Sequence, residues 1–165
     1  MKKIIIGMLF FLSACSWTPV YKTVGLIEQT NTVLVNPIPN LSGRLMTRLL
    51  NNILNPDHIQ TEKKYVLSVN LTEETVRDQG ILSDDTASRE NLYVTADYEL
   101  KDIKSGKVIL NSSTKLVDSY DILSQPYATV TRSQKARENL IQLLSETIGN
   151  HVASVIKNEN LSQSN

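Results

Sequence analysis

Few side chains in this sequence have the types and spacing that catalysis or metal binding requires. The chain has two histidines, His58 and His151, which lie far from each other in the sequence. A zinc site needs cysteine, histidine or carboxylate ligands at short recurring spacings, and no such spacing accompanies either histidine. We interpret both histidines as solvated or partly packed side chains, and we predict no metal site and no cofactor.

The paired carboxylates are no better suited to chemistry. Glu73-Glu74 falls in a predicted strand, where neighbouring side chains point to opposite faces, whereas an acid–base pair must converge on one substrate. Asp84-Asp85 opens the segment DDTAS, which could hold a cation but lacks the ligand-rich spacing of a calcium loop. The sequence also has no glycine-rich phosphate loop, no nucleophile elbow and no His-Glu-x-x-His motif. These observations predict that the protein is not an enzyme.

Cys15, the single cysteine, has the clearest chemical role. It follows the basic pair Lys2-Lys3, the apolar run 4–12 and the small residues Ser13-Ala14, an order typical of a cleaved signal peptide. The run has about half of the ~20 apolar residues that a membrane-spanning helix needs. A small buried hydrophobe and a reactive thiol are the other interpretations of a lone cysteine. A core role fits poorly with these flanks.

The four residues Leu12 to Cys15, LSAC, resemble the lipobox of bacterial lipoproteins. In that class the cysteine thiol receives a diacylglyceryl group, the signal is removed, and the new amine is usually acylated. Burial of a chain gives only ~0.8 kcal/mol per methylene, so stable anchoring takes more than one chain. The resemblance implies a signal peptide over residues 1–14, diacylglyceryl and N-acyl attachment at Cys15, and a lipidated N-terminus and tether over residues 15–31.

Composition excludes another class of partner. Seventeen basic residues are balanced by seventeen acidic residues, whereas a nucleic-acid-binding domain shows a strong basic excess. We therefore predict no nucleic-acid partner. Because no second cysteine is present, the fold must be stabilised by packing without an internal disulfide.

Residues 32–157 have the patterns of one folded domain. Thr32–Asn36 is a short β-branched run that prolines follow, which predicts an edge strand. A helix is then predicted up to Asn55-Pro56, since proline disfavours helical geometry in the residue before it. The apolar residues recur at helical spacing and are Leu41, Leu45, Met46, Leu49, Leu50, Ile53 and Leu54.

Three further strands are predicted after this helix. Apolar and polar residues alternate from Tyr65 to Thr72 and from Leu92 to Lys101, as strands with one buried face require. The segment Asp102–Lys107, with Gly106 for a positive φ, predicts a hairpin into a strand over Val108–Tyr120. Gln79–Ser88 is long for a hairpin loop, so it is either mobile or functional.

The last element is a long amphipathic helix. Thr131 and Gln134 fit a capping box at its start. Gly149 lies inside it and should weaken it by ~1 kcal/mol relative to alanine. Its apolar stripe consists of Ala136, Leu140, Leu143, Leu144, Ile148, Val152, Val155 and Ile156. Residues 158–165 are predicted to be a disordered tail. The sequence predicts a single α+β domain of order β-α-β-β-β-α, with a four-stranded sheet packed by two helices on one face.

Several segments in this order resemble the lipopolysaccharide-assembly lipoproteins of the LptE family. The resemblance covers nearly all of residues 15–157. It rests on CSWTPVY at 15–21, DTASR at 85–89, ADYELKD at 96–102, SGKV at 105–108 and SYDILSQPYA at 119–128. Ser16 departs from the usual glycine and Trp17 from the usual phenylalanine, and neither change conflicts with the anchor or the fold.

The resemblance implies a non-catalytic role at the outer membrane. Members are lipid-anchored on the periplasmic side, within the β-barrel of the lipopolysaccharide (LPS) translocon. There they plug the barrel, help it to assemble and contact LPS during delivery to the cell surface. Ser16, in place of an inner-membrane retention aspartate, agrees with the outer membrane. An alternative is an auxiliary lipoprotein of a phospholipid-trafficking ABC-type transporter.

Two arginines match the loop-edge basic positions that this family associates with LPS contact. Arg89 follows DDTAS, and Arg132 lies at the start of the predicted last helix. Arginine forms forked, charge-assisted hydrogen bonds with phosphate, which LPS carries. The alternative is a solvated surface charge, or an ion pair with Asp84 or Asp85.

Overall fold

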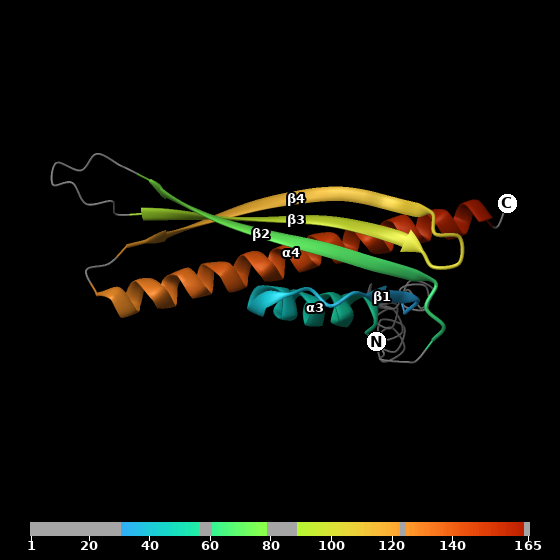
Figure 1. Cartoon of the computed structure of the whole chain (residues 1–165), viewed down its shortest axis with the longest axis horizontal. Coiled ribbons are helices and arrows are strands. Elements are labelled where there is room, and N and C mark those ends of the chain that lie inside the picture. The colour runs from blue at the N-terminus through green and yellow to red at the C-terminus, as the bar shows by residue number, and fades with distance from the viewer. Residues whose placement is uncertain (1–30, 57–60, 79–88, 123–124, 164–165) are drawn as a thin grey trace, which may run out of the picture.

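A computed structural model describes residues 31–56, 61–78, 89–122 and 125–163 (Figure 1). The elements in chain order are β1 (Val33–Val35), α3 (Asn40–Leu54), β2 (Tyr65–Asp78), β3 (Arg89–Asp102), β4 (Val108–Asp121) and α4 (Pro126–Gln163). The α+β class and the order β-α-β-β-β-α predicted from the sequence are confirmed. None of the helices in these ranges is long and apolar enough to cross a membrane.

The strands form one mixed sheet in the order β1-β2-β3-β4. β1 pairs in parallel with the start of β2, and α3 is the crossover that parallel pairing requires. β2, β3 and β4 form an antiparallel meander. β2 stays paired with β3 from Tyr65↔Asp102 to Asp78↔Arg89, well beyond the Thr72 predicted as its end. Main-chain pairing continues there because it does not depend on the apolar alternation that marks the first half of β2.

One face of the sheet and both helices enclose a single core, which confirms the predicted packing. The buried side chains of β3 alternate along the strand, as its period-two pattern predicts, and are Leu92, Val94, Ala96, Tyr98 and Leu100. The buried side chains of α4 in this core are Leu140, Ile141, Leu144, Ile148, Val152 and Ile156. The sheet's other face carries β4 side chains such as Lys115 and Val117, both exposed.

Two leucines of the predicted helical stripes are exposed in the structure. Leu41 is 71% exposed and Leu143 is 51% exposed, whereas Ile141, outside the predicted stripe, is fully buried. Leu41 lies in the first turn of α3, before the first buried residue of that helix, Gly43. At Leu143 the prediction fails because α4 packs against both the sheet and α3. Its buried surface is therefore wider than one stripe and is displaced toward Ile141.

α4 is longer than its sequence pattern predicts at both ends. It begins at Pro126, where proline suits the first helical position, and Thr131 Oγ1 donates to the Tyr127 carbonyl (3.0 Å) inside the helix. The capping box at Thr131 is therefore wrong. The disordered tail is also wrong for residues 158–163, which are helical. Two contacts from other parts of the chain fix this last stretch, Lys107–Glu159 at 3.6 Å and Lys64 Nζ donating to Asn160 Oδ1 at 3.5 Å.

Gly149 lies where α3 packs against α4. A Cβ atom at this position would lie 2.7 Å from Ile53 Cγ2 of α3, which is closer than real Cβ contacts. The glycine that costs α4 some helix propensity thus allows α3 to pack directly against it.

Lys63 links the end of α3 to the residues before β1. Lys63 Nζ donates to the Asn31 carbonyl (2.7 Å) and to Asn55 Oδ1 (2.8 Å). Burial lowers the pKa of Lys63. These bonds fix the end of α3 beside the start of β1.

Candidate anion-binding site

The structure brings the two predicted arginines together. Arg89 begins β3 and Arg132 lies near the start of α4, and both contact Asp121, the last residue of β4. Arg89 Nε lies 3.5 Å from Asp121 Oδ1, and Arg132 Nη1 lies 3.1 Å from Asp121 Oδ2. Both arginines are therefore ion-paired, with a partner that was not predicted from the sequence. Asp84 and Asp85 lie outside the described residues.

The positions of Arg89 and Asp121 follow from the sheet register. They are directly paired across β3 and β4. Two side-chain bonds hold the same strand ends together, from Tyr120 Oη to Glu90 Oε2 (2.5 Å) and from Ser119 Oγ to Asn91 Oδ1 (2.6 Å). Arg132 reaches this pair from the helix side because α4 begins beside the end of β4.

A shallow hollow of about 270 Å³ surrounds these side chains. Its lining residues are Arg89, Asp118, Ser119, Tyr120, Asp121, Arg132, Lys135, Ala136 and Asn139. Three cations and two carboxylates face it. Lys135 is the cation that sequence reasoning missed, although its position three residues after Arg132 places both on one side of a helix.

The chemistry open to this cluster is exchangeable anion binding. The side chains of Arg89, Arg132 and Asp121 are between 50% and 59% exposed, so their ion pairs are weak and solvent competes for them. A phosphate can displace the carboxylate because guanidinium groups bind phosphate with paired, charge-assisted hydrogen bonds.

The other positions singled out from the sequence lie partly outside the described residues. His151 Nδ1 lies 2.8 Å from the hydroxyl oxygen of buried Tyr98, so this histidine is partly packed, as interpreted from the sequence. No group of three or more potential ligand residues that could hold a metal occurs in the described part of the chain. Cys15, His58 and the DDTAS carboxylates lie outside that part. Glu73 faces the helices and is bonded to Ser42 and Arg137.

Comparison with protein families agrees with this description. The model of the LptE family, described as lipopolysaccharide-assembly, matches residues 30–152, which is most of the chain. The chain belongs to the LptE family. A search among curated protein sequences found no match.

Solved structures with the same fold as this LptE-family chain come from several bacteria. A candidate lipoprotein from Caulobacter crescentus is 22% identical, with 81% of this chain and 97% of that chain covered and a TM-score of 0.65. Rare lipoprotein B from Shewanella oneidensis is 12% identical, with coverage of 78% and 97% and a TM-score of 0.62. A minor lipoprotein from Acinetobacter baumannii is 18% identical, with coverage of 75% and 92% and a TM-score of 0.60. At these low sequence identities, the similarity shows only that the proteins share a fold.

Proposed function

We propose that this LptE-family protein is a lipid-anchored component of the outer-membrane LPS translocon. In this proposal it sits on the periplasmic side within the translocon β-barrel, plugs it, helps it to assemble and contacts LPS in transit. The role is one of binding and assembly, with no reaction catalysed. The observation that carries the proposal is the convergence of Arg89 and Arg132 on Asp121 in a chain of this family.

The contact with LPS is assigned to the Arg89–Arg132 cluster. LPS carries phosphates on its lipid A and core sugars, and Lys135 adds a third cation beside the two arginines. We expect the exposed Asp121 carboxylate to hold the guanidinium groups in place until a phosphate displaces it.

A double substitution tests this contact. Arg89→Asp with Arg132→Asp should fold and co-purify with the barrel but bind LPS roughly tenfold less well in a pull-down at moderate salt, because charge-assisted hydrogen bonds are lost. The matched control is Lys104→Asp with Lys115→Asp, which reverses two exposed cations outside the cluster. Unchanged LPS binding by the arginine variant, with normal circular dichroism, would remove the cluster from the LPS contact.

A substitution of Asp121 should have the opposite effect on LPS binding. Asp121→Asn keeps the shape of the side chain but removes the charge that competes with phosphate. We expect tighter LPS binding by this variant. Weaker binding would mean that Asp121 is needed to position the arginines.

The lipid anchor is tested at Cys15. Cys15→Ala should abolish fatty-acid incorporation and leave an uncleaved or mislocalised precursor. If this variant is still labelled with palmitate and processed, the lipobox interpretation is wrong. Co-purification of the wild-type chain with a detergent-extracted barrel separates the translocon role from that of a transporter's auxiliary lipoprotein.

A further inference from the structure

A second hollow, separate from the Arg89–Arg132 cluster, lies between α3 and the first part of α4. Its volume is about 530 Å³, within the usual range of small-molecule sites. α3 contributes Leu41, Arg44, Leu45 and Arg48, and α4 contributes Val130 and Ile141. We call this hollow the helix groove.

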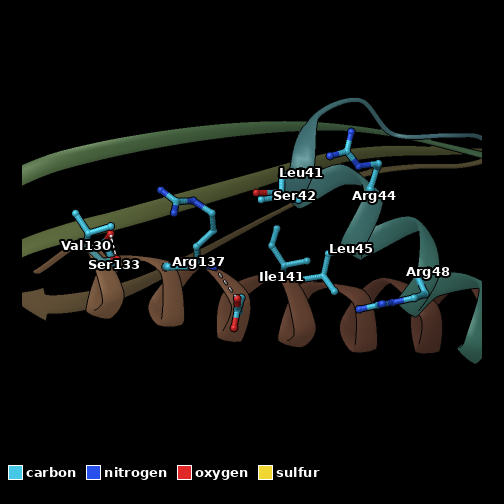
Figure 2. Close-up of a pocket in the computed structure, with 11 residues that line it drawn as sticks. Leu41, Ser42, Arg44, Leu45, Arg48, Val130, Ser133, Arg137 and Ile141 are labelled. Atoms are coloured by element: carbon cyan, nitrogen blue, oxygen red, sulfur yellow. Dashed lines mark hydrogen bonds between the residues drawn. The ribbon is translucent and has the colours of Figure 1, made fainter. Parts of the chain in front are cut away.

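The helix groove has apolar side chains that no described element covers. Leu45 and Ile141 approach each other from the two helices at its floor (Figure 2). Leu41 is 71% exposed and Val130 is 61% exposed at its opening. Single exposed apolar residues are common on protein surfaces, but Leu41, Val130 and the half-buried Leu45 line one hollow above the fully buried Ile141. The groove can therefore shelter an alkyl chain.

The groove also carries cations without carboxylate partners. Arg44 and Arg48 are exposed and lie one helical turn apart, and neither makes an ion pair or a side-chain hydrogen bond with any described residue. Like charges at this spacing destabilise a helix unless an anion lies between or beside them. Figure 2 shows the Arg48 side chain extended from α3 toward α4, whereas the Arg44 side chain points away from α4.

Two further charged residues line the same groove and limit where an anion can bind. Arg137 is occupied by Glu73, with its Nε 2.8 Å from Glu73 Oε2. Glu138 Oε1 accepts a hydrogen bond from Gln134 Nε2 at 3.3 Å. The unpaired positive charge therefore lies on the α3 side, at Arg48 and Arg44.

We propose that the helix groove binds a single-chain amphiphile with a phosphate head. The alkyl chain lies against Leu41, Leu45 and Val130, and the phosphate is bound by Arg48, with Arg44 adding a positive charge one turn away on α3. Phosphate is the head group that fits because it carries up to two negative charges and accepts forked hydrogen bonds from guanidinium groups. This site does not depend on the proposed LPS contact, since the two hollows share no lining residue.

The test uses the full chain held in nanodiscs of neutral phosphatidylcholine and a photoactivatable dodecyl phosphate. We expect labelling of peptides from α3 and from the first half of α4. Unlabelled dodecyl phosphate should abolish this labelling, while inorganic phosphate and dodecyl maltoside at equal concentration should leave most of it. Complete competition by inorganic phosphate would reduce the groove to a simple anion site and overturn the proposal. Complete competition by the maltoside would overturn the role of the arginines.

Substitutions at exposed positions sharpen the same experiment without disturbing the core. Arg48→Gln should reduce labelling about tenfold, and Arg44→Gln should reduce it less. Leu41→Asn with Val130→Asn should reduce it while the circular dichroism stays unchanged. The control is Lys104→Gln with Lys115→Gln, two exposed lysines outside the helix groove, which should label like the wild type. Equal labelling of all these variants would show that the probe does not bind in the helix groove.

Discussion

The two parts of α4 are held in different ways. From Ala136 to Ile156 the helix buries an apolar side chain on each turn, whereas none of the side chains from Pro126 to Lys135 is buried. Both candidate binding surfaces draw on that first part, through Arg132 and Lys135 at one hollow and Val130 at the other. One helix thus combines a segment that stabilises the domain with a segment that is available to ligands. Substitutions in the buried segment should change the free energy of unfolding, whereas substitutions in the exposed segment should change ligand binding.

The largest effect should come from the buried segment. Leu144 is fully buried, so Leu144→Ala should lower the free energy of unfolding by about 2–5 kcal/mol through lost burial and a cavity. Its neighbour Leu143 is 51% exposed, and Leu143→Ala should change that free energy by less than about 0.5 kcal/mol. Urea denaturation followed by circular dichroism measures both. Similar losses for the two leucines would contradict the packing of α4 described above.

The next effect concerns the contact between α3 and α4. Gly149→Ala should improve helix propensity by about 1 kcal/mol, yet its methyl group would meet Ile53 Cγ2. Ile53 is β-branched, and its stiff side chain cannot easily move aside. We therefore expect a net loss of about 1–3 kcal/mol in the free energy of unfolding. Asn150→Ala, at the next and exposed position, should be neutral or slightly stabilising. A stabilised Gly149→Ala protein would mean that the helices can move apart freely.

The sequence predicts the elements whose patterns are local. Alternation in β3 and helical spacing in α3 identify the correct faces, because each pattern arises from burial of one side of one element. Leu143 was wrongly predicted to be buried. The spacing of apolar residues identifies one apolar face of a helix, but it does not show on which side of that face a second element packs. Residues 158–163 were misassigned because their contacts are made with Lys64 and Lys107, which are distant in sequence.

The residues of the candidate site could likewise be predicted only in part from the sequence. Arg89 and Arg132 could be singled out by their loop-edge positions and by family resemblance. Asp121 could not, because its role depends on the pairing of β3 with β4 and on the place where α4 begins. The helix groove was missed for a similar reason, since its two walls come from helices far apart in the chain.

A smaller effect is expected where the buried and exposed segments of α4 meet. Glu73 of β2 accepts hydrogen bonds from Ser42 Oγ (2.6 Å) and Arg137 Nε (2.8 Å), and so joins the sheet to both helices. Glu73→Gln should cost about 0.2–1 kcal/mol of unfolding free energy, since the ion pair is partly exposed. Glu74→Gln, one residue later and exposed, is the matched control. A loss of several kcal/mol would mean that the exposed segment of α4 depends on this one carboxylate.

The smallest effect lies in the turn between β3 and β4, which is held by local bonds outside the core. Asp102 Oδ1 accepts hydrogen bonds from the Ser105 backbone N–H (2.7 Å) and from Ser105 Oγ (2.8 Å), and these bonds hold the pKa of Asp102 below its usual 3.8. Because the folded-state pKa is lowered, the stabilisation is present above pH 3.8 and is lost as the pH falls through the folded value. An NMR titration of the Asp102 carboxyl carbon should show the lowered pKa. Ser105→Ala removes the hydroxyl donor and keeps the backbone donor, so the pKa should rise part of the way back. A pKa that does not respond to Ser105→Ala would assign the shift to the backbone donors of Ser105 and Lys104 and to the charge of Lys64.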